Sequence, residues 1–297
     1  MEQEIYDVMI VGAGPAGMSA AVNARVRNKS VALVSRRFTS PSLARAPAIH
    51  NYLGVEGVSG SELYKRFLEH ARRSEAQLIE SDVIGIYDMG GYFSALASAG
   101  DISARAVVIA TGAVQSASIP GESTLVGSGV SYCATCDGPL YRGKRVVVLG
   151  YTAAAREEAN FLAEICSEVT YVDLQRGKMG DGPSLADSIR VVTGKVLSIR
   201  GETIATHVQL EEESIPADGV FVIRESIPIE RLLDGLTIAD GAIAVDREMA
   251  TSVPGVFAAG DCTGRPWQVA KAVGEGLAAG LSAARHVDRL AAAARIV

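Results

Sequence analysis

The residues Gly12-Ala13-Gly14-Pro15-Ala16-Gly17 follow an apolar run from Tyr6 to Val11 and precede a segment of small residues from about Met18 to Arg27. Each glycine of this pattern meets a separate need. Gly12 allows a tight turn, Gly14 lets the backbone approach a pyrophosphate, and Gly17 lets a helix pack closely on a strand. The N-terminus of such a helix also favours phosphate charge. The stretch therefore predicts a strand–turn–helix unit that binds a dinucleotide.

The opposite end of the chain carries a second signature of the same domain. Val256-Phe257-Ala258-Ala259-Gly260-Asp261 predicts a strand that runs into Gly-Asp, and a small-residue helix is expected from Gln268 to about Leu290. Another apolar strand, Ala106–Ala110, ends in Thr111-Gly112. We expect Asp261 to accept hydrogen bonds from a ligand at a helix N-terminus; its simpler interpretation is an N-cap. One domain is thus predicted from both ends of the chain.

Between these ends the strand–helix–strand order repeats. We predict a strand at Arg145–Leu149, a helix over about Ala153–Cys166 and a strand at Val169–Leu174. The phosphate loop does not repeat, because Gly150 is followed by the bulky Tyr151. An NADPH site also needs several arginines after the second strand, and only Arg176 stands there. The fold class is therefore α/β with two Rossmann-like, three-layer ββα domains, the second inserted in the first and degenerate as a nicotinamide site.

A redox motif lies between the two nucleotide-binding patterns. Cys133-Ala134-Thr135-Cys136 has the C-x-x-C spacing at which two thiols close a small disulfide and exchange two electrons as a unit. Asp137 follows at once and is a candidate for moving the accompanying protons. The alternative is half of a structural zinc site, which needs a second pair of Cys or His ligands. The four histidines show no such spacing, so no metal is expected.

Composition narrows the class of protein. The net charge of −6 argues against a general nucleic-acid binder. No apolar run reaches the roughly 18 residues of a membrane helix. The acidic start runs directly into a predicted strand, so we expect no signal peptide, no membrane association and a cytoplasmic location. Four cysteines, two of them in one motif, do not make a secreted disulfide framework.

Over nearly its whole length the chain resembles the low-molecular-weight thioredoxin reductases. The resemblance lies in the motifs at Gly12–Gly17, Asn51-Tyr52-Leu53-Gly54, Ala110-Thr111-Gly112, Cys133–Asp137 and Val256–Asp261, and in Gln268. It implies FAD, a homodimer and a small middle domain that carries the dithiol and rotates. The implied FAD-binding domain comprises residues 1–113 and 234–297, and the implied degenerate NAD(P)H-like domain comprises residues 114–233.

The resemblance also assigns residues to roles. Cys136 would face the flavin, Cys133 would attack the disulfide of thioredoxin or a thioredoxin-like protein, and Asp137 would move protons. The second strand of the first unit ends in Ser35-Arg36-Arg37, where an acidic ribose ligand would be expected. The expected FAD contacts are Gly12, Gly14, Pro15, Ala16, Gly17, Ser35, Arg36, Asn51, Thr111, Gly112, Gly260, Asp261, Trp267, Gln268 and Val269.

Departures from the family pattern concern the electron donor. The glycine-rich loop of the middle domain is replaced by Gly150-Tyr151-Thr152, the basic motif by Asp173-Leu174-Gln175, and the Gly-x-x-Pro segment near the nicotinamide by Arg224–Pro228. In these positions the chain resembles the ferredoxin-dependent flavin thioredoxin reductases. We therefore expect reduced ferredoxin or flavodoxin, and not NADPH, as the donor.

Three other functions stay open at this stage. The first is an NAD(P)H-dependent thioredoxin reductase with an atypical loop, in which Asp173 would favour NADH. The second is a flavin dithiol oxidase that passes electrons to oxygen, and the third is a non-enzymatic flavoprotein sensor.

Trp267 could stack on the flavin or simply pack. The basic and acidic helix Leu63–Arg73 is expected to be a solvated face, or else a docking patch for an acidic ferredoxin.

Two further cysteines are expected to have no redox role. Cys166 falls at the end of the predicted helix Ala153–Cys166 and is expected to be a small core residue. Cys262 follows Asp261 and is expected to pack near the cofactor without taking part in catalysis.

Overall fold

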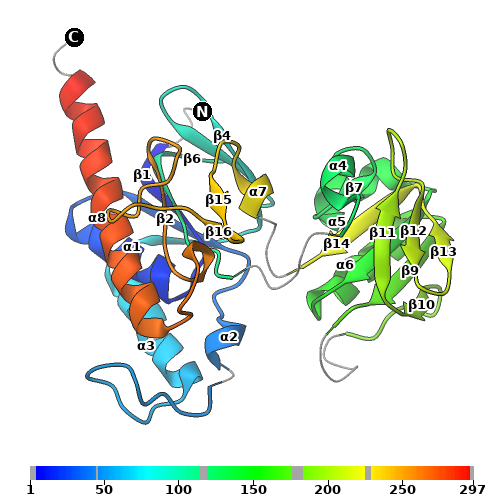
Figure 1. The fold of residues 1–297 in the computed structure, drawn as a ribbon, viewed down its shortest axis with the longest axis horizontal. Coiled ribbons are helices and arrows are strands. Elements are labelled where there is room, and N and C mark those ends of the chain that lie inside the picture. Colours follow the sequence, from blue (N-terminus) through cyan, green and yellow to red (C-terminus); the bar gives the residue numbers. More distant parts are fainter. Residues whose placement is uncertain (1–4, 45, 114–118, 176–182, 225–228, 295–297) are drawn as a thin grey trace. The chain divides into compact units, whose positions relative to one another are not determined.

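The computed structural model describes residues 5–44, 46–113, 119–175, 183–224 and 229–294 (Figure 1). Of the segment Arg224–Pro228, only Arg224 falls within these residues. Contacts divide the chain into two compact units, one comprising Met1–Val114 with Pro228–Val297 and the other Gln115–Ile227. The first unit is thus built from both ends of the chain.

A seven-stranded sheet forms the centre of the first unit, with the order β3-β2-β1-β6-β5-β4 and with β17 paired to β6. The neighbours β3, β2, β1, β6 and β17 pair in parallel. Strand β5 pairs antiparallel with β4 on one side and with the first half of β6 on the other. Their bounds are β1 Ile5–Val11, β2 Val31–Ser35, β3 Gln77–Glu80, β4 Val83–Asp88, β5 Phe93–Ala97, β6 Ile102–Ile109 and β17 Val256–Ala258.

Each face of this sheet has its own core because successive strand residues point to opposite faces. In β1, Val8 and Ile10 pack beneath helices α1 (Pro15–Val26), α3 (Gly60–Arg73) and α8 (Val269–Ala294), whereas Met9 and Val11 belong to the core on the other face. Ile229 and Leu232 of α7 (Ile229–Leu232) join that second core. The remaining elements are α2 Pro41–Ala44, β15 Ile238–Ala239, β16 Ala242–Ile243 and the 3-10 helix η2 Asp261–Thr263.

Helices α1 and α8 touch backbone to backbone. A Cβ added at Gly276 would lie 2.1 Å from the carbonyl oxygen of Ala16, and one added at Gly280 would lie 2.5 Å from that of Ala20. The Ser19 hydroxyl donates to the carbonyl oxygen of Val273 at 2.7 Å. The small residues of both helices therefore fix how the N-terminal turn of α1 sits against the C-terminal part of the chain.

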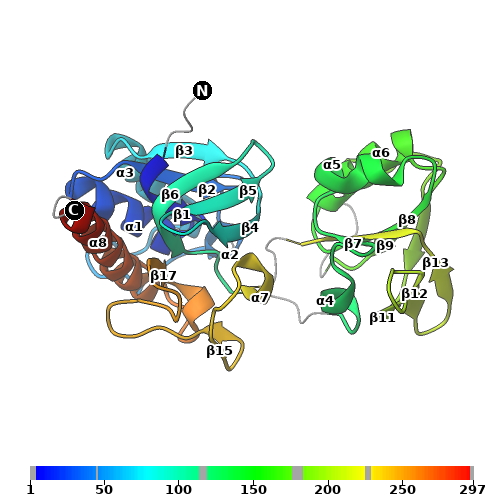
Figure 2. The same cartoon turned by 90° about the horizontal axis from the view of Figure 1, so that it is seen from above.

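The second unit is also three-layered (Figure 2). Its parallel sheet has the order β10-β9-β8-β14-β7, with helices on one face and a three-stranded antiparallel sheet, β11-β12-β13, on the other. The strand bounds are β7 Val130–Ser131, β8 Arg145–Gly150, β9 Glu168–Asp173, β10 Arg190–Thr193, β11 Val196–Arg200, β12 His207–Leu210, β13 Ser214–Pro216 and β14 Gly219–Ile223. The helices are α4 Glu122–Leu125, α5 Ala134–Asp137, the 3-10 helix η1 Gly138–Tyr141 and α6 Ala154–Ile165. Both units thus have the predicted α/β, Rossmann-like, three-layer fold.

Candidate active site

The dinucleotide loop has the geometry that its glycines predicted. Gly12 has a φ of +110°, and a Cβ there would lie 2.2 Å from the carbonyl oxygen of Ala110, so only glycine fits. A Cβ on Gly17 would lie 1.8 Å from the Gly12 carbonyl oxygen, whereas one on Gly14 meets nothing within 4 Å. Pro15 is the first residue of α1, and Ala16 is buried against Gly260. Open space therefore lies at Gly14, beside the N-terminus of a twelve-residue helix whose first amides have no partner within the helix itself.

A second group of predicted residues lies at the ends of β6 and β17. These neighbouring parallel strands, paired through Phe257 and Val108, lead into Thr111-Gly112 and Gly260-Asp261. The Thr111 hydroxyl is buried and, among the described residues, has no hydrogen-bond partner. Gly112 has a φ of +79° with open space around its Cβ position. The sequence placed Asp261 at a helix N-terminus, and it begins the short η2; the long helix, predicted from Gln268, is α8, which starts at Val269.

Two residues that the sequence analysis missed hold the Gly260–Gly264 loop. Lys271 Nζ donates to the carbonyl oxygens of Gly260 and Gly264 at 2.8 and 2.9 Å and to Thr263 Oγ1 at 3.0 Å. It also pairs with Glu275 at 3.0 Å, and Glu275 accepts from the Gly260 amide at 2.9 Å. This Lys271–Glu275 clamp fixes Asp261 relative to α8. The one signal in the sequence for this clamp is the spacing of four residues between a Lys and a Glu on the predicted helix.

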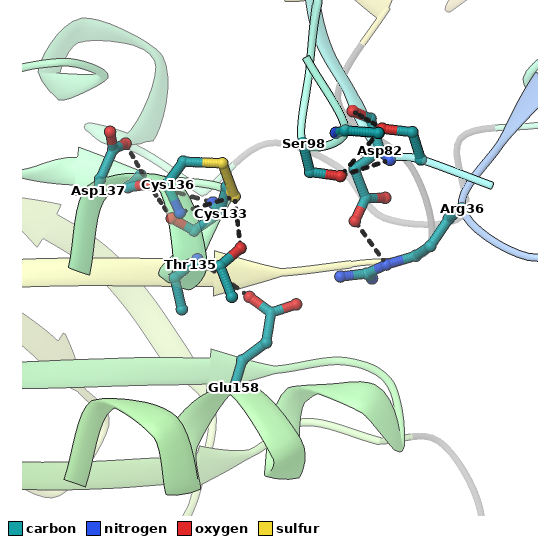
Figure 3. Close-up of a disulfide and its surroundings, with 12 residues drawn as sticks. Arg36, Asp82, Ser98, Cys133, Thr135, Cys136, Asp137 and Glu158 are labelled. Carbon is teal, nitrogen blue, oxygen red and sulfur yellow. Dashed lines mark hydrogen bonds and ion pairs between the residues drawn. A yellow bond between two sulfur atoms is a disulfide. The ribbon is translucent and has the colours of Figure 1, made fainter. Parts of the chain in front are cut away.

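The remaining predicted contacts of the first unit are held by neighbouring side chains. Asn51 Nδ2 donates to Gln268 Oε1 at 2.7 Å, so residues 217 positions apart meet. Arg36, after β2, forms an ion pair with Asp82 at 3.0 Å (Figure 3). Ser35 donates to the Arg37 carbonyl oxygen. Trp267 is 51% exposed, with the Arg265 guanidinium 4.5 Å from its ring centroid, so it is not a core residue of its own unit.

Burial governs the titration of the two groups after Gly260. Burial raises the pKa of Asp261, with the charge of Lys271 acting in the opposite direction. Burial also raises the pKa of Cys262 to about 12, and its thiol lies 3.3 Å from the Ala259 carbonyl oxygen. Cys262 is therefore a protonated core thiol at neutral pH. Cys166, beyond the end of α6, is half-buried against the same core as Phe161 and Ile165.

In the second unit Cys133 and Cys136 form a disulfide (Figure 3). Cys133 caps α5 and is buried, whereas Cys136 is exposed. The Cys133 sulfur accepts from the Cys136 amide at 3.2 Å and lies 3.3 Å from Thr135 Oγ1. Hydrogen-bond donors of this kind stabilise a thiolate. When the bond opens, Cys133 is therefore the sulfur better able to leave as a thiolate, and Cys136 is the one that a reductant reaches.

Two carboxylates flank this disulfide. The Asp137 carboxylate accepts from Ser131 Oγ at 2.7 Å, and Glu158 of α6 accepts from the Ala134 amide at 3.0 Å (Figure 3). Neither Ser131 nor Glu158 was predicted from the sequence. Ser131 could have been found only as a serine two residues before the motif, on the strand that leads into it.

The crevice of the second sheet is filled by the protein itself. Strands β8 and β14 lie side by side, with Gly150 opposite Ile223, so Tyr151 and Arg224 leave the sheet at the same carboxyl edge. The Arg224 guanidinium lies 4.8 Å from the Tyr151 ring centroid and 2.7 Å from Glu122 Oε2. The Arg224 and Glu122 side chains are 4% and 0% exposed. Glu122 also accepts from the Tyr132 hydroxyl at 3.1 Å.

The end of β9 carries a second internal ion pair. Asp173 stands where the second strand of a nucleotide-binding unit places its ribose-binding acid. Its carboxylate lies 3.5 Å from Arg156 of α6, and the two side chains are 6% and 14% exposed. The Asp173 side chain also accepts from the Gln175 amide at 3.1 Å. The carboxylate is thus engaged within its own unit.

Two Rossmann-like units, a dinucleotide loop in one and a C-x-x-C disulfide in the other define the class of flavin disulfide oxidoreductases. The model of the family described as "Pyridine nucleotide-disulphide oxidoreductase" matches residues 6–276. The chain belongs to this family, and it is an oxidoreductase of the thioredoxin reductase type.

Individual relatives agree with this assignment. The chain is 34% identical to a thioredoxin reductase of Bacillus subtilis, with 97% of each chain covered. A crystal structure of a ferredoxin-flavin thioredoxin reductase from Clostridium acetobutylicum superimposes with a TM-score of 0.91 at 42% identity, covering 97% of this chain and 99% of that one. A thioredoxin reductase from Gloeobacter violaceus gives a TM-score of 0.81 at 32% identity, covering 97% and 96%.

Members of this family bind FAD, and the residues of the first unit fit it. The open space at Gly14 suits a pyrophosphate. The buried Thr111 hydroxyl, which has no partner among the described residues, can form a hydrogen bond with the cofactor. The half-buried Asp261 carboxylate is suited to accept from ribityl hydroxyls. Within the described residues, no helix is both long and apolar enough to cross a membrane.

Proposed function

We propose that the protein reduces the disulfide of thioredoxin, or of a thioredoxin-like protein, with electrons that reach Cys133 and Cys136 through FAD from reduced ferredoxin or flavodoxin. The proposal assigns FAD binding to the domain predicted as residues 1–113 and 234–297 and the dithiol to the domain predicted as residues 114–233. Because Ile229 and Leu232 of α7 pack in a core of the first unit, α7 belongs with the FAD-binding domain. The thioredoxin reductase relatives support the substrate. The likeness to the Clostridium ferredoxin-flavin enzyme supports the donor.

The filled crevice of the second unit is the observation that carries the donor assignment. Dinucleotides bind outside the carboxyl ends of parallel strands, where the strand order reverses. Here that place, between β8 and β14, holds Tyr151 stacked on the buried Arg224–Glu122 pair. Admitting a pyridine nucleotide would separate this pair and leave a buried charge alone, which typically costs about 3–5 kcal/mol. The Arg156–Asp173 pair raises the same obstacle to a ribose.

The chemistry divides among the residues of the two units. FAD, when bound, supplies two electrons at a time to a disulfide. The exposed Cys136 sulfur is the one that would accept them, and Cys133 would leave as a thiolate that the Cys136 amide stabilises. Cys133 then attacks the disulfide of the protein substrate, Cys136 resolves the mixed disulfide, and Asp137 moves protons at the two sulfurs. Two electrons passing from about −400 mV for a plant-type ferredoxin to about −270 mV for thioredoxin release about 6 kcal/mol, so the direction is favourable.

A reconstituted assay tests the proposal. Ferredoxin kept reduced under anaerobic conditions, the holoenzyme and oxidised thioredoxin should together yield two thioredoxin thiols per disulfide, and Cys136→Ser should abolish the yield. Thiol release driven equally well by NADPH would favour a pyridine-nucleotide-dependent reductase. Peroxide formed from a dithiol in air would favour an oxidase, and unchanged function of Cys136→Ser would favour a sensor.

The homodimer also belongs to the proposal and rests on the resemblance. Light scattering should give about twice the chain mass of 31.0 kDa. A mass of one chain at micromolar concentration would contradict it. The cytoplasmic location stays a prediction.

A further inference from the structure

We propose that Ser131 is a positioning residue that holds the Asp137 carboxylate for proton transfer at the Cys133–Cys136 disulfide. The inference rests on the proposed function only in assigning the proton transfer to Asp137. Ser131 ends β7, the edge strand of the parallel sheet of the second unit, and is 4% exposed. It therefore has a fixed position from which to act on the exposed side of the motif.

The hydrogen bonds of Ser131 point to this role. Its hydroxyl lies 2.7 Å from Asp137 Oδ2 and 3.2 Å from the Cys133 carbonyl oxygen, and it accepts from the Cys133 amide at 3.1 Å. A hydroxyl has one proton, and the shorter contact to a carboxylate is the stronger of the two. Ser131 thus donates to the Asp137 carboxylate while it holds the backbone of Cys133. One side chain therefore fixes the position of the carboxylate relative to the residue that carries the Cys133 sulfur.

The arrangement also selects one oxygen of the carboxylate. Asp137 Oδ2 is engaged with Ser131, whereas Oδ1 has no hydrogen-bond partner within the described part of the chain. Oδ1 is therefore the oxygen left to carry a proton to or from the dithiol. Without Ser131 the half-buried carboxylate could rotate, and the proton would reach the sulfur less often.

A small reductant isolates this step from both the flavin and the protein substrate. Dithiothreitol donates two electrons: its thiolate bonds to the exposed Cys136 sulfur, the Cys133–Cys136 bond breaks, and Cys133 leaves as a thiolate that takes up a proton. The second thiol of dithiothreitol then displaces Cys136, which is protonated, and dithiothreitol becomes its cyclic disulfide. Acid quenching, alkylation and mass spectrometry of the holoenzyme count the two freed thiols.

The proposal predicts four results. Ser131→Ala slows opening roughly tenfold, as expected for the loss of one hydrogen bond to a charged group. Ser131→Thr, which keeps the hydroxyl, stays within about twofold of the wild type. The double variant Ser131→Ala/Asp137→Asn is no slower than Asp137→Asn alone, because Ser131 acts through Asp137. Imidazole buffer, a small proton donor, accelerates Ser131→Ala but not the wild type.

Ser103→Ala is the matched control. Ser103 is 1% exposed, and among the described residues its hydroxyl has no hydrogen-bond partner. Its loss should leave the opening rate unchanged. Ser131→Gly, which also lacks the hydroxyl, replaces Ser131→Ala should the latter not fold.

Opening at the wild-type rate in Ser131→Ala, or effects of Ser131 and Asp137 that simply add, would overturn the proposal. A wild-type protein that is opened by dithiothreitol but does not reduce thioredoxin would refute the proposed function alone.

Discussion

The two sulfurs of the disulfide differ in their surroundings, and this difference supports the roles proposed for them. Cys133 is buried and receives the Cys136 amide hydrogen bond, whereas Cys136 is exposed. Thiol–disulfide exchange needs one sulfur that is accessible to attack and a second sulfur that leaves readily as a thiolate. The asymmetry therefore supports the proposal that Cys136 accepts the electrons and that Cys133 is released as a thiolate.

Replacing Cys133 tests these roles. Cys133→Ser should lower thioredoxin turnover by more than about a hundredfold, because the attacking sulfur is gone. The flavin should still be reduced by the donor, since Cys133 is not proposed to contact it. Anaerobic spectra and a thiol-release assay on the same sample separate the two. Normal turnover of this variant would show that Cys133 is not the nucleophile.

The buried Cys262 provides a prediction on reactivity. Because burial raises the pKa of its thiol to about 12, the reactive thiolate is scarce in the folded protein at pH 8. Iodoacetamide should therefore label the half-buried Cys166 well before Cys262, as peptide mass spectrometry can show. In urea both should react alike. Early labelling of Cys262 in the folded protein would contradict its burial.

Glycines of helix α8 let it pack closely against helix α1 in the first unit. Gly276 sits against the Ala16 backbone, while Gly274, two residues away, is exposed with no atom near its Cβ position. Gly276→Ala should lower the free energy of unfolding by roughly 1–3 kcal/mol through overpacking. Gly274→Ala should raise it by about 0.5–1 kcal/mol. Urea titrations compare the two, and equal effects would rule out the close α1–α8 contact.

The Lys271–Glu275 clamp should matter for the cofactor more than for folding alone. Lys271→Met removes three donors from the Gly260–Gly264 loop and leaves Glu275 without its cation. We expect FAD affinity to fall roughly tenfold, measured by flavin release on dilution. Lys195→Met is the control, since its pair with Glu211 is largely exposed and worth little. Unchanged affinity in Lys271→Met would show that the clamp does not support the site.

At the scale of the whole molecule, much of the architecture could be predicted because local patterns carried it. The glycines of Gly12–Gly17, the two strand–helix–strand units and the C-x-x-C motif each depend on neighbours in sequence. The start of α8 was predicted at Gln268, one residue before the observed start at Val269, but the short 3-10 helix Asp261–Thr263 was not predicted. Local patterns misplace such boundaries readily.

Contacts between distant segments were beyond the sequence. Glu122 and Arg224 are 102 residues apart and look like ordinary surface residues until the sheet brings them together. Asn51 and Gln268 likewise meet across 217 positions. Ser131 and Glu158 lie near the dithiol in space, but only the first is near it in sequence. The replacement of a glycine-rich loop by Gly150-Tyr151-Thr152 could be read from the sequence, whereas the contact of Tyr151 with Arg224 could not.

We propose that electrons enter from a protein donor because Tyr151, Arg224 and Glu122 occupy the place of a dinucleotide in the second unit. An anaerobic titration of the holoenzyme tests it most directly, with NADPH, NADH and reduced ferredoxin added in turn while the flavin absorbance is followed. We expect rapid bleaching by reduced ferredoxin and no bleaching by either nicotinamide nucleotide within the same time. Rapid bleaching by NADPH or NADH would contradict it.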